Sequence, residues 1–156
     1  MLNSLKIKEY VNDKSYLIYK KSLSYKDGMN RFYYLVIKDN RIIDMFIEKE
    51  LEGLIDEERL SNDNIDLIVY KAVKCENNRY YSFRMRGRIE YRIGELVEVT
   101  NSIGIFCCKD PSLTEEHYNT GEDKVILKVK VKIDDVVGGN TRDFTFKKCI
   151  PIEVIY

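Results

Sequence analysis

Alternation of apolar and polar residues is the main pattern along this chain, and it predicts a protein built mainly of β-strands. In the range 124–134, apolar residues at every second position alternate with lysines, and only Ile126 breaks the polar face. Because side chains of a strand point alternately to its two faces, this range predicts an antiparallel strand with one buried and one wet face. Twelve tyrosines and six phenylalanines also favour strands.

Two pairs of neighbouring residues, Asp39-Asn40 and Asn77-Asn78, mark tight turns between alternating runs. Both residue types tolerate the positive φ that a hairpin turn requires. They predict hairpins that join 31–37 to 41–47 and 65–74 to 79–85. The other predicted elements are strands over 2–10, 15–20, 90–99 (bent at Gly94) and 103–108, a turn at 138–140, and one or two closing strands in 143–156 with Pro151 at an edge or bend.

Two stretches depart from this pattern and predict short helices. Ile47, Leu51, Leu54 and Ile55 have helical spacing, which predicts a helix ending near Leu60. Asp110-Pro111 has the residues of a helix start. The predicted fold is therefore α+β, a mainly antiparallel, curved or barrel-like β-sheet with two short helices. The polar run 61–64 suggests a boundary between an N-terminal hairpin module with its helix (1–60) and a main β-rich domain (65–156), or a loop within one continuous domain.

Charge and cysteine usage narrow the classes of function. Lysine plus arginine and aspartate plus glutamate number 26 each, so the formal net charge is zero. This balance counts against a protein that works mainly as a polyanion binder, although a local patch can still act. No apolar run is long enough to span a membrane, and early charged residues interrupt any signal peptide. Four cysteines without a spaced framework favour a reducing cytoplasm.

An arginine-rich run near the middle of the chain is the first candidate site. In an extended segment Arg84, Arg86 and Arg88 share one face at spacings of about 7 Å, within reach of phosphates or acidic side chains. Tyrosines beside them can stack on bases. The alternative is that these arginines are solvated or pair with the acidic stretch 44–66 of the same chain. The predicted binding residues are Tyr81, Arg84, Arg86, Arg88, Tyr91 and Arg92.

Cysteines and the one histidine form the second candidate. Cys107 and Cys108 point to opposite faces of a strand, no CxxC motif is present, and one histidine cannot complete a histidine-rich site. A nucleophile–base pair of a cysteine with His117 is chemically conceivable, but the spacing does not require it. The sequence therefore predicts no catalytic residue, no metal and no cofactor.

Three short motifs occur at 70–73 (YKAV), 91–95 (YRIGE) and 104–107 (GIFC), and a long alternating strand follows them. Together they resemble a loose family of small, uncharacterised β-rich domains of phage and bacterial proteins, some of which follow pentapeptide-repeat tracts. The likeness covers 69–156. Phe106 stands where many such domains carry histidine. The resemblance implies a compact β-rich module of phage or mobile-element type and assigns no reaction.

Three functional hypotheses follow. The first is a non-enzymatic cytoplasmic binding module, encoded by a phage or mobile element, that docks on and inhibits a host protein or protein–nucleic-acid complex such as a defence nuclease. Direct contact with nucleic acid belongs to this hypothesis; a membrane partner does not. The second is a nucleotide-handling or transferase-type enzyme with a pocket near Tyr70–Arg92. The third is a structural protein that self-associates through β edges, as in a homodimer.

Overall fold

A computed structural model shows the fold and describes residues 2–24, 29–51, 53–83, 88–100, 104–113, 123–139 and 143–155. Strands dominate, so the prediction of a β-rich α+β fold is confirmed. The strands are β1 (Leu17–Ser24), β2 (Asn30–Lys38), β3 (Arg41–Ile47), β4 (Asp66–Glu76), β5 (Arg79–Tyr81), β6 (Glu90–Tyr91), β7 (Val97–Glu98), β8 (Ile105–Cys108), β9 (Lys124–Lys132), β10 (Val136–Gly139), β11 (Asp143–Phe146) and β12 (Lys148–Val154). The helical elements are α1 (Leu2–Asn12) and the 3-10 turns η1 (Glu48–Leu51), η2 (Glu57–Arg59), η3 (Pro111–Leu113) and η4 (Ile133–Asp135).

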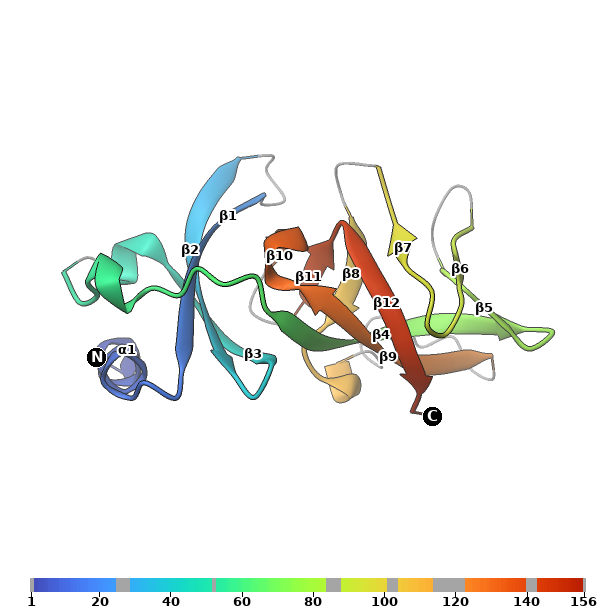
Figure 1. The fold of residues 1–156 in the computed structure, drawn as a ribbon, viewed down its shortest axis with the longest axis horizontal. Helices are drawn as coiled ribbons and strands as arrows, with labels where there is room; N and C mark the ends of the chain where they lie inside the picture. Colours follow the sequence, from blue (N-terminus) through green and yellow to red (C-terminus); the bar gives the residue numbers. More distant parts are fainter. Residues whose placement is uncertain are drawn as a thin grey trace.

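The described strands form one strongly curved sheet (Figure 1). Their order is β3-β2-β1-β10-β11-β8-β4-β9-β12-β7, and β5 and β6 form a side arm on β4. The pairs are antiparallel except β1 with β10, which is parallel. The sheet does not close into a barrel. The β2–β3 turn nevertheless reaches β4, because Ile68 N donates to Asn40 O and Asn40 Nδ2 donates to Asp66 O, each at 2.8 Å.

A glycine allows the N-terminal hairpin to join the rest of the sheet. Ser24 of β1 lies opposite Gly138 of β10. A Cβ at Gly138 would lie 3.0 Å from the Ser24 carbonyl oxygen, closer than most real Cβ contacts. The sequence prediction of a turn at 138–140 was wrong for Gly138 and Gly139, which are strand residues; Asn140 lies outside the described residues.

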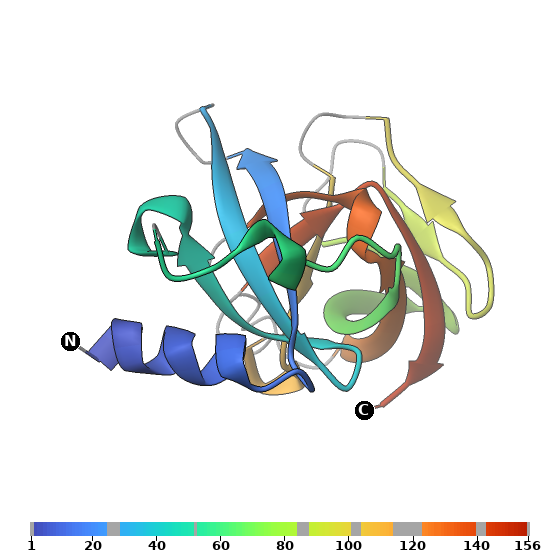
Figure 2. The same ribbon diagram turned by 60° about the vertical axis from the view of Figure 1, so that its left-hand side comes forward.

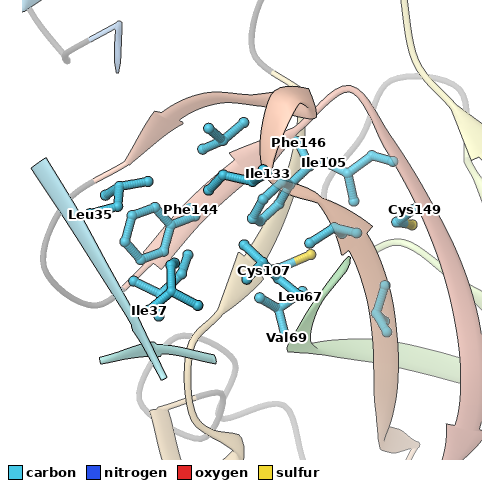
Figure 3. Packing of buried hydrophobic residues seen from close by; sticks show 14 of the residues in the cluster. Leu35, Ile37, Leu67, Val69, Ile105, Cys107, Ile133, Phe144, Phe146 and Cys149 are labelled. Carbon is cyan, nitrogen blue, oxygen red and sulfur yellow. The ribbon is translucent and has the colours of Figure 1, made fainter. Parts of the chain in front are cut away.

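Both parts of the chain build the main core. Figure 3 shows Leu35 and Ile37 from the N-terminal hairpin beside Leu67, Val69 and Phe144 of the later strands. A second, smaller cluster lies between α1 and the opposite face of the hairpin, where Ile7, Ile18, Tyr34, Val36, Phe46 and Leu51 are buried (Figure 2). The sheet and the core are thus continuous across the polar run 61–64, and independent folding of 1–60 stays a prediction.

The prediction of a strand over 2–10 was wrong, because this segment is the helix α1. Ile7, Tyr10 and Val11 pack against the smaller cluster, and their spacing of three and four residues is helical. The Arg59 side chain caps the end of this helix. Its guanidinium donates to the carbonyl oxygens of Val11 and Tyr16 at 2.8 Å, and of Asp13 and Tyr10 at 2.9 and 3.0 Å. Distant residues therefore stabilise a helix that is too short to persist alone.

The prediction of a helix from Ile47 to Leu60 was also wrong. The segment forms the two short turns η1 and η2, and Gly53 between them has φ +77°, outside the helical region. Leu51 and Ile55 pack inward as their spacing indicated, whereas Ile47 is 44% exposed. The helical spacing of the apolar residues in this segment arises because the consecutive turns η1 and η2 pack around the smaller apolar cluster.

Most of the remaining predicted elements are confirmed, with shifted ends. Both hairpin turns have positive φ at each central residue, 52° at Asp39 and Asn77 and 62° at Asn40 and Asn78. The predicted strand 90–99 divides at Gly94 (φ +83°) into β6, which pairs with β5, and β7, which pairs with β12. Pro151 lies at a register shift in β12, and the predicted helix at 110 is the 3-10 turn η3 within the described residues. Across the described ranges, no helix is long and apolar enough to cross a membrane.

Strand β3 ends the sheet, and carboxylates of β3 and of the following turn η1 accept hydrogen bonds from two of its backbone amides. Met45 N donates to Asp44 Oδ1 at 2.9 Å, and Ile47 N donates to Glu50 Oε2 at 3.2 Å. Because these two amides lie two residues apart, they point to the same side of the strand. The carboxylates thus occupy donors that an exposed edge would otherwise offer to another chain.

Candidate functional site

The described part of the arginine run lies on the arm formed by β5, β6 and the end of β4. Arg88 Nη2 contacts Glu76 Oε2 at 2.5 Å, and its guanidinium lies 4.1 Å from the centre of the Tyr81 ring. Arg92 pairs with Glu90 at 3.3 Å. The side chains of Arg88 and Arg92 remain 49% and 59% exposed, so both are accessible to a partner.

The other predicted contact residues are placed differently. The Tyr91 ring is only 1% exposed and belongs to the main core, so it is not on the binding surface. Tyr81 is half-buried, under Arg88. Arg84 and Arg86 lie outside the described residues, and their role stays a prediction.

The acidic stretch 44–66 does not supply the ion pairs of the described arm arginines. Their partners are Glu76 and Glu90, which belong to the arm itself. Figure 1 shows the turns η1 and η2 at the opposite end of the molecule from β5 and β6. The turns of the acidic stretch and the arginines of the arm therefore lie at opposite ends of the molecule.

Strand pairing extends the basic surface of the arm onto the outer face of the main sheet. Asp66, Ile68, Tyr70 and Lys74 of β4 lie opposite Lys132, Lys130, Lys128 and Lys124 of β9. Directly paired residues point to the same face, and the alternate residues Leu67, Val69 and Val73 point into the core. We call this surface the cationic face. Its cations are Lys74, Arg79, Arg88, Arg92, Lys124, Lys128, Lys130, Lys132 and Lys148, and its carboxylates are Asp66, Glu76, Glu90, Glu98 and Glu153.

Cations outnumber carboxylates on the cationic face, and each of these carboxylates is already in an ion pair. The pairs include Lys132 with Asp66 at 2.7 Å, Lys128 with Glu153 at 3.7 Å and Lys148 with Glu98 at 3.8 Å. The neighbouring Lys132 and Lys130 also lower the pKa of Asp66, chiefly through the hydrogen bond from Lys132. From the sequence, the lysines of β9 were predicted only to lie on the solvent-exposed face of a strand. Their proximity to the arm depends on the register between β4 and β9, which the sequence alone does not give.

The most unusual buried group is Lys71, which sequence reasoning missed as a site. Its side chain is 6% exposed and points into the core, in line with Leu67, Val69 and Val73 of the same strand. Nζ donates to Phe106 O at 2.7 Å and lies 5.6 Å from the centre of the Tyr91 ring. Burial lowers the pKa of this amine well below that of a free lysine, because a charge is costly to desolvate. The signal was present as a lysine on the apolar side of an alternating strand.

The position of Lys71 follows from the way β8 leaves β4. The two strands pair only at Tyr70 and Cys108, and the lysine amine reaches the Phe106 carbonyl just beyond that pair. The Lys71 side chain thus donates to the Phe106 carbonyl, to which a backbone amide would donate if the β4–β8 hydrogen-bond ladder continued. A neutral amine can do this without a carboxylate partner.

The four cysteines are free, and the environment of the three buried ones does not favour reactivity. Burial raises the pKa of the Cys107 and Cys149 thiols to about 12 and also raises that of Cys108, with a further contribution from Asp143. Nucleophilic cysteines need a lowered pKa and some exposure. His117 lies outside the described residues, and the described ranges contain no group of three side chains suited to a metal.

Comparison of the chain with protein-family models, with curated proteins and with solved structures finds no match. The resemblance to small phage and bacterial domains therefore stays a prediction. What indicates a function is the distribution of charge and apolar groups on the surface.

Proposed function

We propose that this protein is a binding module that docks its cationic face on an acidic surface of a partner protein, free or in complex with nucleic acid. The observation that carries the proposal is the cation excess on this face of the sheet and the arm, in a chain whose formal net charge is zero. Charge segregated in this way steers association and selects partners by complementarity.

The exposed arginines add directional contacts to this surface. Arg88 and Arg92 each keep about half or more of their side chain accessible while a carboxylate holds one end in place. A guanidinium held in this way can bind a second carboxylate or a phosphate with its remaining donors. Arginine and tyrosine are also the residue types that most often dominate binding energy at interfaces, and here Arg88 stacks on Tyr81.

A docking face without reaction chemistry acts by covering its target. Inhibition of a host protein such as a defence nuclease, by a module of phage or mobile-element origin, belongs to this proposal. The buried thiols give no support to the alternative of cysteine-based catalysis.

The experiment is isolation of the partner from the native cells, followed by measurement of its dissociation constant at several salt concentrations. We expect replacement of Arg88, Arg92 and Lys130 together by alanine to weaken binding more than about tenfold, a loss of about 1.4 kcal/mol. The control replaces Lys8, Lys14 and Lys49, which are exposed and lie outside this face, and changes the net charge equally. Equal effects of the two triple variants, or no effect of the first, would refute the proposal.

A further inference from the structure

Three parallel rows of side chains cross the part of the cationic face formed by β4, β9 and β12. The middle row contains Ile150, Lys130 and Ile68, which lie directly opposite one another on the three strands. Leu96 extends this row, because it comes one residue before the Val97–Cys149 pair and borders the same hollow as Ile150. The middle row is therefore aliphatic except for one lysine.

Charged rows border the middle row on both sides. One contains the ion pairs Lys148–Glu98 and Lys132–Asp66, and the other contains Lys128–Glu153. Lys130, between them, forms no direct ion pair with the described residues and acts on Asp66 only through longer-range electrostatics. Its ammonium group can therefore form a direct ion pair with a carboxylate of a partner at the centre of this surface.

A hollow of about 330 Å³ opens at these rows. Leu96 and Ile150 give it apolar walls, while Lys130, Lys132 and Lys148 supply cations and Asp66 and Asp135 supply carboxylates. Leu96 is 57% exposed, and the backbone of the same loop is fixed because Gly94 N donates to Pro151 O at 2.8 Å. An exposed aliphatic side chain on a fixed backbone, beside a hollow, is a typical feature of a protein-binding surface.

We infer that this hollow receives a large aliphatic side chain of the partner, with an adjacent carboxylate of the same segment bound to Lys130. Leu96 and Ile150 supply the apolar contact, and the Lys130 ammonium selects an acidic rather than a basic segment. The inference rests on the proposed function, since it names the chemistry that the cationic face recognises. It also places the centre of the interface on β9 and β12 rather than on the arginine arm.

The test is a titration of the ¹⁵N-labelled full chain with short peptides, followed by the shifts of its backbone amide signals. One peptide carries a leucine between acidic residues, a second has serine in place of that leucine, and a third has lysines in place of the acids. We expect the leucine peptide to shift the amides of Leu96, Lys130 and Ile150 and to bind at least about fivefold more tightly than the serine peptide. We expect the lysine peptide to leave them unchanged.

Two substitutions outside the core assign the contacts. Leu96→Ser is expected to remove the preference for leucine over serine, and Lys130→Gln to weaken both acidic peptides. Equal affinity for the leucine and serine peptides overturns the hollow as a specific site but leaves docking of the cationic face intact. Absence of binding by either acidic peptide also overturns it, and the partner experiment then decides the proposed function independently. Stronger shifts with a single-stranded oligonucleotide, unaffected by Leu96→Ser, would overturn it in favour of a phosphate-binding surface.

Discussion

Replacement of Lys71 by methionine should remove a specific pH dependence of stability. In the folded protein the amine is buried, its pKa is lowered by desolvation, and Phe106 O accepts its hydrogen bond. In the unfolded chain the same amine is protonated below the ordinary lysine pKa of about 10.4. Unfolding therefore takes up a proton at pH values between the lowered pKa of the folded state and the ordinary lysine pKa. In this pH window the free energy of unfolding rises with pH, and this contribution to stability is lost as pH falls.

The magnitude follows from the number of protons taken up. Uptake of one full proton changes the free energy of unfolding by about 1.4 kcal/mol per pH unit, so the contribution of Lys71 has an upper limit of about 2 kcal/mol between about pH 7 and about pH 8.5. The window ends below the ordinary thiol pKa of 9.0, because the buried thiols Cys107 and Cys149 have raised pKa values and lower the stability at higher pH. Urea denaturation at several pH values gives the free energy of unfolding of wild type and Lys71→Met as a function of pH. The difference between the two slopes against pH is the contribution of Lys71.

Lys74→Met is the matched control for this experiment. Lys74 lies on the same strand, but its ammonium is half-exposed and pairs with Glu76 at 3.0 Å. We expect this variant to keep the wild-type slope, whereas Lys71→Met flattens it. Parallel pH profiles for wild type and Lys71→Met would refute the assignment of a neutral buried amine.

Three further predictions concern the fold. Gly104→Ala should lower the free energy of unfolding, measured by urea denaturation, by at least about 1 kcal/mol more than Gly94→Ala. Both glycines have positive φ, but only at Gly104 would the new Cβ meet Val137 Cγ2 at 2.9 Å and Phe146 O at 3.0 Å. Equal losses for the two variants would contradict this. Arg59→Met should destabilise by about 2–3 kcal/mol through loss of the cap on α1, and a loss under about 0.5 kcal/mol would show that water replaces the guanidinium. In the native protein a thiol reagent should react quickly with Cys75 alone, and the three buried cysteines should react only after unfolding. Fast reaction of the native Cys75→Ser variant would disprove the burial of those three cysteines.

Local signals predicted the strands and their turns well. Asp39-Asn40 and Asn77-Asn78 fixed two hairpins because their residue types accept the backbone conformation of the turn. The long strand β9 was clear because every second residue is apolar. The helix α1 was missed because it is stabilised by contacts distant in sequence, such as Tyr10 OH donating to Asp44 and the cap from Arg59.

The candidate site was predicted only in part, since it depends on strand register. The sequence indicated the exposed Arg88 and Arg92, but Tyr91 in the same run is buried. Nothing local relates Lys130 to Ile150, which lie twenty residues apart on neighbouring strands. Lys71 did leave a local signal, as a lysine on the apolar side of its strand.

The carboxylates that bond the amides of Met45 and Ile47 limit how copies of this protein could associate through their sheets. Strand-to-strand polymerisation requires two open edges on each molecule, so that every copy can add to the next. At β3, a new strand would first have to displace Asp44 and Glu50 from those amides, and hydrogen bonds to charged groups are worth about 1.5–3 kcal/mol each. Association of copies through their sheet edges is therefore disfavoured at β3.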